Sequence, residues 1–480
     1  MDRRAALGGR GIFVNRPHVV VIGGGFAGLR TAVALADARV RVTVLEGRMS
    51  LGGRARSFMD PVSGEIVDNG QHLFLGGYKE TLSFLRRLGT DDRMIFQRRL
   101  RVTFVQPGHR RSVLSCPAAP APWHLLLGVA GLSSLSVLDK LGFRRVARVV
   151  REFSDGNSDA GEQLDRETVE SWLIRLGQSE RARAAFWNPL AVATLNEDPT
   201  KASALGLMSV LRTLLFGRWP EARLGMAAVG LSELYTDAAR QIVEGKGGEV
   251  LVNRPVADLK IADSRVVGVR LADGTVLTPE LVVSSLPPAA LSQILPQDPS
   301  VEADPVLGRL SRFTTSPIIS INLWFDEPIT KALFVGFIGT KTQWLFNKEA
   351  ILAKAGVPAN YLTLIISAAH GLIEQPKDKI VSIALQDLRA CFPRARKARL
   401  IRSQVVRERE ATVSLGVGTQ AWRPGPRTGL SNLFLAGDWT DTGLPATIES
   451  AVVSGRICAE TVLKELASLP LDEYNKPIIC

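Results

Sequence analysis

The chain has 480 residues, 46% hydrophobic and 22% charged, which is the composition of a globular protein large enough for two domains. Its formal net charge of +12 favours an anionic partner such as nucleic acid, anionic lipid or an acidic ligand. Nucleic acid is disfavoured, because the sequence has no zinc-finger spacing, no RNA-recognition signature and only 6% aromatic residues. The four cysteines form no CxxC pair, which argues against a metal site and is typical of a reducing compartment.

No secretory signal is expected, because Met1–Phe13 carries charges but no apolar core. The longest apolar stretch, Leu125–Leu138, contains glycines and serines and is too short to span a bilayer. The sequence therefore predicts a cytoplasmic protein.

An N-terminal β-α-β unit is the clearest structural pattern in the chain. His18–Ile22 reads HVVVI, which is typical of a buried strand, and Phe26–Ala36 has helical character. Val40–Leu45 is a second β-branched run. This order within about 30 residues predicts the first unit of a dinucleotide-binding fold.

The turn between the first strand and the helix carries a glycine pattern suited to a pyrophosphate. Gly23 allows the tight turn, Gly25 lets the backbone approach the phosphates, and Gly28 lets helix and strand pack closely. Phe26 and Ala27 begin the helix, whose unpaired N–H groups give it a positive end. A plain glycine turn is the alternative interpretation.

Charged residues follow the second strand where a dinucleotide needs them. Glu46 ends that strand eighteen residues after Gly28, the place for an acid that binds ribose hydroxyls. Gly52, Gly53 and Arg54 come next, and a glycine pair beside an arginine can wrap and neutralise a pyrophosphate. An ordinary loop is the alternative for this second segment.

A further cofactor segment lies near the C-terminus. The buried strand Leu433–Leu435 leads to Gly437 and Asp438, and an aspartate at a strand tip can accept ribityl or ribose hydroxyls. The helix that follows can point N–H groups at the N1–O2 edge of a flavin. The residues expected at this edge are Ala446, Thr447 and Ile448. The two ends together favour FAD over a nicotinamide cofactor, with an ordinary β-turn-α crossover as the alternative.

The remaining pattern predicts an α/β fold, in which a Rossmann-like FAD-binding domain is interleaved with a mixed α+β substrate domain. Helical character dominates from Leu125 to Val243, and short β runs return from Val250 to Val283. The segments assigned to the FAD-binding domain are 17–100, 245–300 and 425–466. The segments assigned to the substrate domain are 101–244 and 301–424.

Several segments resemble one family of flavoproteins. HVVVIGGGFAGL, with LEGR and LGGRARSF, is similar to the superfamily of amine oxidases, carotenoid desaturases and protoporphyrinogen oxidases. Within it, the chain resembles the squalene-associated, desaturase-like flavoproteins, the hydroxysqualene dehydroxylases of bacterial hopanoid synthesis. The segments that carry this resemblance are DNGQHLFLGGY (Asp68–Tyr78), FWNPLAVATLN (Phe186–Asn196), SPIISINLWFDEPI (Ser316–Ile329), TQWLFNK (Thr342–Lys348) and LAGDWTDTGLPATIESAV (Leu435–Val452).

The resemblance implies that the FAD-binding domain is of the amine-oxidase type. It also implies an FAD enzyme that removes the allylic hydroxyl of hydroxysqualene and delivers a hydride, giving squalene. It places Gln71, His72 and Val256 at the cofactor, and His72 near the leaving hydroxyl, where a proton donor is needed. The alternative is that His72 only holds the loop and the flavin by hydrogen bonds.

A long isoprenoid substrate has to be collected from lipid, so a membrane-docking face is expected. Lys140, Arg144, Arg148 and Arg151 lie on one stripe of a predicted helix, directly after the apolar stretch from Trp123 to Leu138. This combination suits a peripheral protein on the anionic inner membrane of a bacterium. A solvated helix face beside a core helix is the alternative.

Two other functions stay open at this point. The first is an oxidative carotenoid desaturase or amine oxidase of the same superfamily, in which electrons flow from the substrate to FAD. The second is a non-enzymatic, flavin-free protein that binds prenyl tails, and the intact set of Glu46, Arg54 and Asp438 argues against it. No second dinucleotide motif identifies the reductant of FAD.

Overall fold

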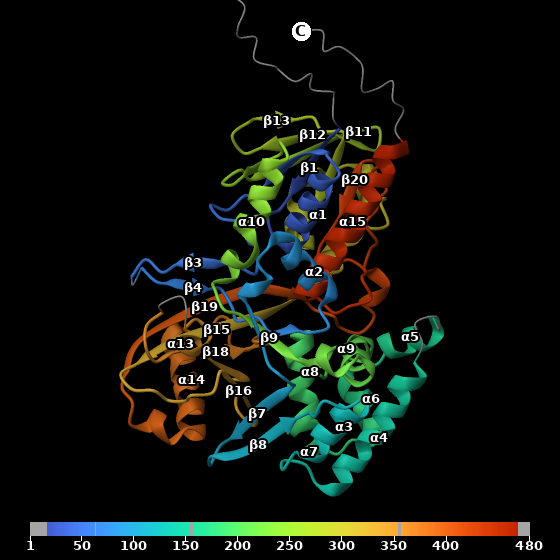
Figure 1. Cartoon of the computed structure of the whole chain (residues 1–480). Coiled ribbons are helices and arrows are strands. Elements are labelled where there is room, and N and C mark those ends of the chain that lie inside the picture. Colours follow the sequence, from blue (N-terminus) through green and yellow to red (C-terminus); the bar gives the residue numbers. More distant parts are fainter. Residues whose placement is uncertain (1–16, 63, 154–157, 354–356, 469–480) are drawn as a thin grey trace, which may run out of the picture.

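The computed structural model describes residues 17–62, 64–153, 158–353 and 357–468 (Figure 1). The segment Met1–Phe13, in which no secretory signal is expected, lies outside these residues. One part of the molecule is built on a parallel sheet, and the other on a larger mixed sheet with a helical lobe beside it (Figure 1).

A five-stranded parallel sheet forms the centre of the upper part in Figure 1. In spatial order its strands are β10 (Glu249–Leu251), β2 (Arg41–Leu45), β1 (His18–Ile22), β14 (Leu281–Ser284) and β20 (Leu433–Leu435). The strands predicted at the start and near the end of the chain are confirmed. Because all neighbours run parallel, the ends of β1, β2 and β20 that carry the predicted cofactor residues lie at one edge of the sheet.

Side chains of β1 alternate between two covering layers, as the period of a strand requires. Val19 and Val21 pack against helices, whereas Val20 and Ile22 pack against a small antiparallel sheet. The helices are α1 (Phe26–Asp37), α2 (Lys79–Leu88), α10 (Leu231–Gly245) and α15 (Ile448–Ser468). The strands of the small sheet are β11 (Val256–Ala262), β12 (Arg265–Leu271) and β13 (Val276–Leu277).

Helix α10 lies within the stretch 101–244 that the sequence assigns to the substrate domain, yet it packs on α1. The ring of Tyr235 stacks on that of Phe26, with 3.7 Å between the ring centroids. We therefore propose that α10 belongs to the FAD-binding domain, and the other expected domain limits stay a proposal.

A seven-stranded mixed sheet forms the left half of the lower part (Figure 1). In spatial order its strands are β19 (Leu400–Val413), β15 (Thr315–Phe325), β18 (Tyr361–Ile366), β17 (Trp344–Asn347), β16 (Phe334–Phe337), β7 (Arg101–Gln106) and β8 (Arg110–Ser115). Along β15, Ile319 and Ile321 pack against α14 (Lys377–Cys391). Ser320 and Asn322 alternate with them and so present polar groups on the opposite face of the sheet, toward the parallel-sheet part.

Shorter elements connect the two parts. The strands are β3 (Ser57–Met59), β4 (Ile66–Asp68), β5 (Phe74–Leu75), β6 (Met94–Phe96) and β9 (Leu224–Ala227). The helices are α11 (Pro288–Ile294), α12 (Pro299–Glu302) and α13 (Lys348–Ile351).

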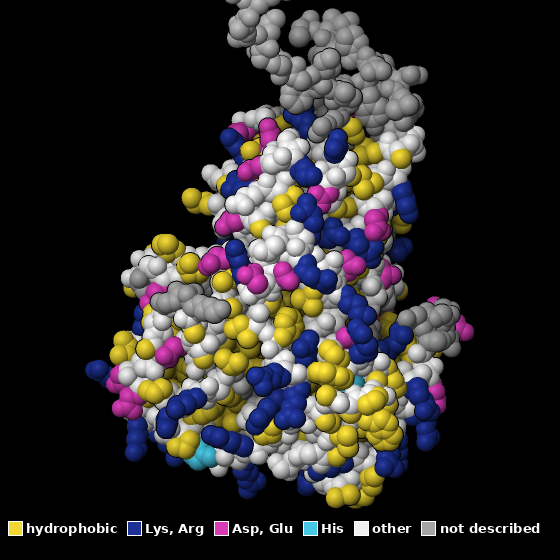
Figure 2. Space-filling model, in the orientation of Figure 1, with side chains coloured by type: hydrophobic (Ala, Val, Ile, Leu, Met, Phe, Trp, Pro, Cys, Tyr) yellow, Lys and Arg dark blue, Asp and Glu magenta, His cyan; other side chains and the backbone are white. Residues whose placement is uncertain are grey.

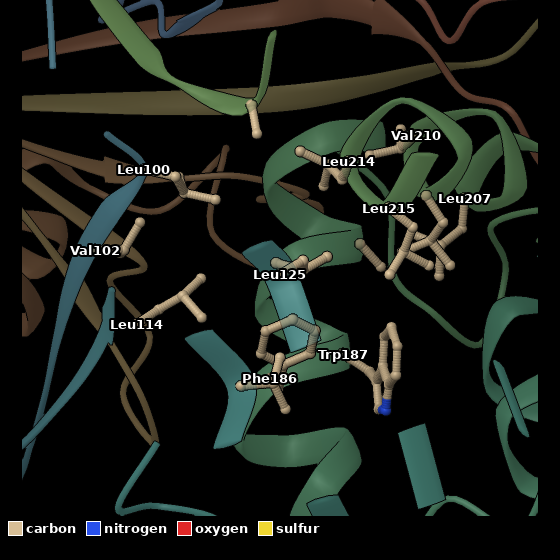
Figure 3. Close-up of a cluster of buried hydrophobic side chains, with 14 of the residues drawn as sticks. Leu100, Val102, Leu114, Leu125, Phe186, Trp187, Leu207, Val210, Leu214 and Leu215 are labelled. Atoms are coloured by element: carbon tan, nitrogen blue, oxygen red, sulfur yellow. The ribbon is translucent and has the colours of Figure 1, made fainter. Parts of the chain in front are cut away.

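The helical lobe lies beside β8, an edge strand of the mixed sheet (Figure 1). Its helices are α3 (Trp123–Ala130), α4 (Val137–Glu152), α5 (Ser158–Asp165), α6 (Val169–Arg175), α7 (Glu180–Ala182), α8 (Asn188–Leu195) and α9 (Ala204–Phe216). Leu125, Phe186 and Trp187 meet Leu214 and Leu215 of α9 in one apolar core (Figure 3). Within the described residues, no helix is long and apolar enough to cross a bilayer.

Candidate active site

The turn after β1 presents bare backbone at the start of α1. A Cβ atom at Gly28 would lie 2.0 Å from the carbonyl oxygen of Gly23, so only glycine lets the helix pack this closely on the turn. Gly23 itself has φ of 106°, in the left-handed region that favours glycine. No side chain caps the helix at Gly25, so the first-turn N–H groups at Phe26 and Ala27 are available for an anion.

A second glycine turn touches the first. An ideal Cβ at Gly53 would lie 3.3 Å from Cα of Gly25, and the Gly52 N–H donates to the Gly24 carbonyl at 2.9 Å. The Tyr235 hydroxyl donates to the Gly52 carbonyl at 2.8 Å and so fixes this turn from α10. Two side-chain-free turns in contact form a cradle for a pyrophosphate.

An acid stands at one end of this cradle. Glu46 is buried, and its carboxylate accepts hydrogen bonds from the N–H groups of Gly24 and Arg48, both at 2.9 Å. A carboxylate has about four lone-pair sites, so two stay available for ribose hydroxyls. The Arg254 N–H donates to the Glu46 carbonyl, which brings the start of β11, and with it Val256, to the same end.

A second acid is connected to these turns through Arg54, the residue after Gly53. Asp438 is buried after β20, and its Oδ1 accepts a hydrogen bond of 2.5 Å from the Arg54 guanidinium. Gly437 before it has φ of 149°. The sequence predicts that Arg54 neutralises a pyrophosphate, but in the structure its charge is shared with Asp438, so phosphate binding by Arg54 stays a prediction.

The N-terminus of α15 lies next along the chain. The helix begins at Ile448, and the Thr447 hydroxyl accepts from the Ser450 N–H at 3.3 Å. Ala446 is buried directly before it. Burial and the nearby Glu449 carboxylate raise the pKa of Tyr78, whose hydroxyl also bonds Thr447, to about 12, so this phenol stays protonated.

The loop that starts at Asp68 is attached to these cofactor segments. The Asn69 side-chain amide donates to the Arg54 carbonyl at 2.5 Å, and its oxygen accepts from the Arg56 N–H. Gln71 and His72 follow and are half-buried. The structure therefore brings His72, Arg54 and, through Arg54, Asp438 into one region, although they are far apart in the sequence.

His72 is held in a defined state. Its Nδ1 lies 3.2 Å from the Gly70 carbonyl, which can only accept, so Nδ1 carries the proton and Nε2 the lone pair. Burial lowers the pKa of His72 and so favours the neutral ring. The Asp68 carboxylate has the opposite but smaller effect. The resting imidazole is thus a hydrogen-bond acceptor at Nε2, and it has to gain a proton before it can act as an acid.

Comparisons with known proteins decide the family. Residues 26–463 match the family described as flavin containing amine oxidoreductase. The chain is 30% identical to a hydroxysqualene dehydroxylase of Rhodopseudomonas palustris, over 93% of this chain and 98% of the relative. The chain belongs to the hydroxysqualene dehydroxylase family. It is an FAD-dependent oxidoreductase of the amine oxidase superfamily.

More distant relatives agree on the fold. A 15-cis-phytoene desaturase of Synechococcus elongatus is 26% identical over 96% of this chain and 99% of the relative. A solved cyclohexylamine oxidase of Brevibacterium oxydans has a TM-score of 0.70 at 18% identity, covering 94% of this chain and all of that one. The predicted fold class, an amine-oxidase-type FAD-binding fold, is confirmed.

The site of this dehydroxylase-family chain fits FAD. The uncapped end of α1 and the paired turns at Gly25 and Gly53 leave backbone donors and no side chains at the predicted pyrophosphate position. Glu46 bonds the first turn and Asp438 bonds Arg54 beside the second, so two buried carboxylates are held near the turns as predicted acceptors for ribose and ribityl hydroxyls. The individual contacts to FAD stay predictions.

Two residues of the site were missed from the sequence. Arg423 is buried and donates to the carbonyls of Asp438, Thr440 and Leu444 at 3.0, 2.6 and 2.7 Å, so it shapes the loop between β20 and α15. Lys348 donates to Asp68 and Gln71 across the two parts of the molecule. The sequence assigns a role to neither residue, although Lys348 ends the TQWLFNK segment quoted for the resemblance, because single basic residues are common and their partners lie elsewhere in the chain.

Proposed function

We propose that the protein catalyses the reductive dehydroxylation of hydroxysqualene to squalene, as a step of bacterial hopanoid synthesis. The observation that carries the proposal is the match to the Rhodopseudomonas palustris dehydroxylase over 93% of this chain. The phytoene desaturases, at 26% identity or less, represent the related alternative of oxidative chemistry. The flavin-free prenyl-binding alternative loses its support, because the chain belongs to a family of FAD oxidoreductases.

The proposed reaction needs a proton and a hydride. Protonation lets the allylic hydroxyl leave as water, and the resulting allylic cation is quenched by hydride. Bound reduced FAD supplies that hydride. On the protein side, the Asp68–His72 loop is the candidate for holding the hydroxyl and moving the proton, and the apolar lobe is the candidate for receiving the hydrocarbon tail and excluding water.

The direction of electron flow tests this proposal. Enzyme reduced anaerobically with dithionite, and freed of the excess, is mixed with hydroxysqualene. We expect the absorbance of oxidised flavin to return in proportion to the squalene formed, measured by gas chromatography. No reoxidation, together with bleaching of the oxidised enzyme by phytoene or an amine, would show that the alternative function is correct.

The lobe also carries the candidate membrane-docking face. The exposed fractions of Trp123, Val137 and Leu138 are 60%, 72% and 79%, which is unusual for large apolar side chains. These residues belong to α3 and the first turn of α4. Figure 2 shows hydrophobic and basic side chains next to each other on the lower part of the molecule.

Helix α4 changes character along one exposed line. Val137 and Leu141 begin the line, and Arg144, Arg148 and Arg151 continue it with exposed side chains. An apolar end that enters lipid and a basic end that meets headgroups suit peripheral binding to an anionic membrane.

One residue of the predicted stripe behaves differently from the rest. Lys140 is half-buried, whereas Arg144, Arg148 and Arg151 are exposed. The basic part of the proposed face therefore rests on the three arginines of α4 rather than on Lys140.

We expect the double change Arg144→Ala and Arg148→Ala to weaken binding to anionic liposomes about 30-fold at low salt. Each basic residue near an anionic surface contributes about 1 kcal/mol, so two contribute about 2 kcal/mol. Co-sedimentation with phosphatidylglycerol vesicles measures the effect. The matched control, Lys246→Ala with Lys260→Ala, removes two exposed charges, one directly after α10 and one on β11, and should bind like the wild type. Equal losses in both double variants would contradict a local docking face.

A further inference from the structure

A buried lysine connects the substrate side of the molecule to the His72 loop. Lys348 is the first residue of α13, and only 2% of its surface is exposed. Its ammonium group donates to Asp68 Oδ2 at 2.8 Å and to Gln71 Oε1 at 2.9 Å. Two of its three N–H donors are thus directed at a loop that lies 277 to 280 residues away in the sequence.

The Asp68 carboxylate, which accepts from Lys348, also accepts hydrogen bonds from two other groups. Asp68 Oδ1 accepts from the Ser57 hydroxyl at 2.7 Å and from the Leu231 N–H at 3.0 Å. Burial by itself would raise the pKa of Asp68, but Lys348 and these hydrogen bonds outweigh it and lower the pKa. The pair is therefore ionised and holds β4, α10 and α13 together.

Stability alone does not account for this arrangement. Burying two charges is expensive, and apolar residues of similar volume are often at least as stabilising as a buried ion pair. A buried pair does fix geometry, because removal of either partner leaves an uncompensated charge. The geometry fixed here is that of Gln71 and of its neighbour His72, whose backbone carbonyl accepts from the Gln71 amide at 3.3 Å.

We propose that Lys348 is a positioning residue of the reaction, which fixes Asp68 and Gln71 and thereby holds the His72 ring where the substrate hydroxyl is protonated. The inference rests on the proposed dehydroxylation. Lys348 acts through the loop, and His72 remains the group that faces the substrate.

The test separates positioning from folding. Lys348→Met alone leaves the Asp68 carboxylate buried without its partner. This single variant should lose stability for that reason, so it cannot separate positioning from folding. Asp68→Asn combined with Lys348→Met removes both charges and should fold and retain flavin. We expect this double variant to lose about 100-fold in single-turnover rate, because small misplacements of a reacting group have effects of this size. Turnover within threefold of the wild type in the folded, yellow double variant would overturn the proposal.

A second readout is independent of activity. The chain has only five histidines, so nitrogen-15 labelling of histidine gives few signals, and the His72→Asn variant assigns the one of interest. We expect the wild type to show a single Nδ1–H tautomer for His72, and the double variant to show exchange broadening or a mixture. An unchanged His72 signal would overturn the proposal even if the wild type proves inactive on hydroxysqualene, so this outcome is distinct from failure of the proposed function.

Two further variants complete the design. Gln71→Ala keeps the ion pair and removes only the amide, so it should disturb the His72 signal in the same direction, and this variant decides the matter if the double variant does not fold. Lys79→Met is the matched control, since the Lys79 side chain is exposed and its pair with Glu221, at 3.4 Å, is weak; this change should leave both readouts unchanged.

Discussion

Replacement of His72 by alanine is expected to slow the reductive single turnover by about 10²–10⁴-fold, the usual contribution of a positioned acid or base. Flavin content should remain unchanged, because the ring bonds to Gly70 within its own loop and no cofactor segment depends on that bond. Absorbance at the flavin maximum gives the flavin content, and stopped-flow reoxidation gives the rate. Loss of flavin with a normal rate per bound flavin would show that His72 has a structural role instead.

The pH dependence adds a second criterion for His72. Burial holds the pKa of His72 below its ordinary value of 6.5, so the protonated ring is a minor form at neutral pH. If this ring donates the proton, the wild-type rate should rise as the pH falls through that lowered pKa. The alanine variant should lack this rise. A wild-type rate that decreases as the pH is lowered would indicate that the neutral ring acts as an acceptor.

The control for His72 is another histidine with a similar contact. His109 is half-buried and its Nδ1 lies 3.1 Å from the Cys391 carbonyl, in the part of the molecule built on the mixed sheet. Its φ of 65° calls for a residue that tolerates the left-handed region, so the change is His109→Asn. This variant should turn over at the wild-type rate.

Replacement of Glu46 by alanine is expected to weaken FAD binding about ten- to hundredfold. The hydrogen bonds lost from a charged acceptor are worth ~1.5–3 kcal/mol. The structure adds a second reason for the loss, because the carboxylate also accepts from the N–H groups of Gly24 and Arg48 and thus holds the phosphate-binding turn. Flavin fluorescence released on dialysis, followed by titration of the apoprotein with FAD, measures the dissociation constant.

A nearby acid provides the control for Glu46. Glu249 lies on β10, the strand next to β2, and its side chain is exposed. Glu249→Ala removes the same charge from the same sheet and should leave the affinity for FAD unchanged. Unaltered flavin occupancy in Glu46→Ala would show that Glu46 is not the ribose ligand.

The local parts of the site were predictable from the sequence. The turn at Gly23, Gly25 and Gly28 can be recognised in the sequence because the backbone conformation or close packing of the turn requires glycine at these positions. Glu46 follows at a fixed distance along the same β-α-β unit, and Asp438 comes directly after a buried strand. These signals are short-range, so composition and spacing within a single segment were enough to predict a dinucleotide site.

Only the tertiary structure showed which residues of those segments are in contact with one another. Arg54 meets Asp438 across 384 residues, and Lys348 meets Asp68 across 280. The tertiary structure also packs α10, most of which lies in the stretch assigned to the substrate domain, on α1. A charged residue has no sequence signal for a partner that distant, because the pairing depends on how two sheets and their covering helices pack. The sequence by itself therefore determined the cofactor and the family resemblance, whereas packing between distant segments determined the burial of His72 and the contacts that hold its loop.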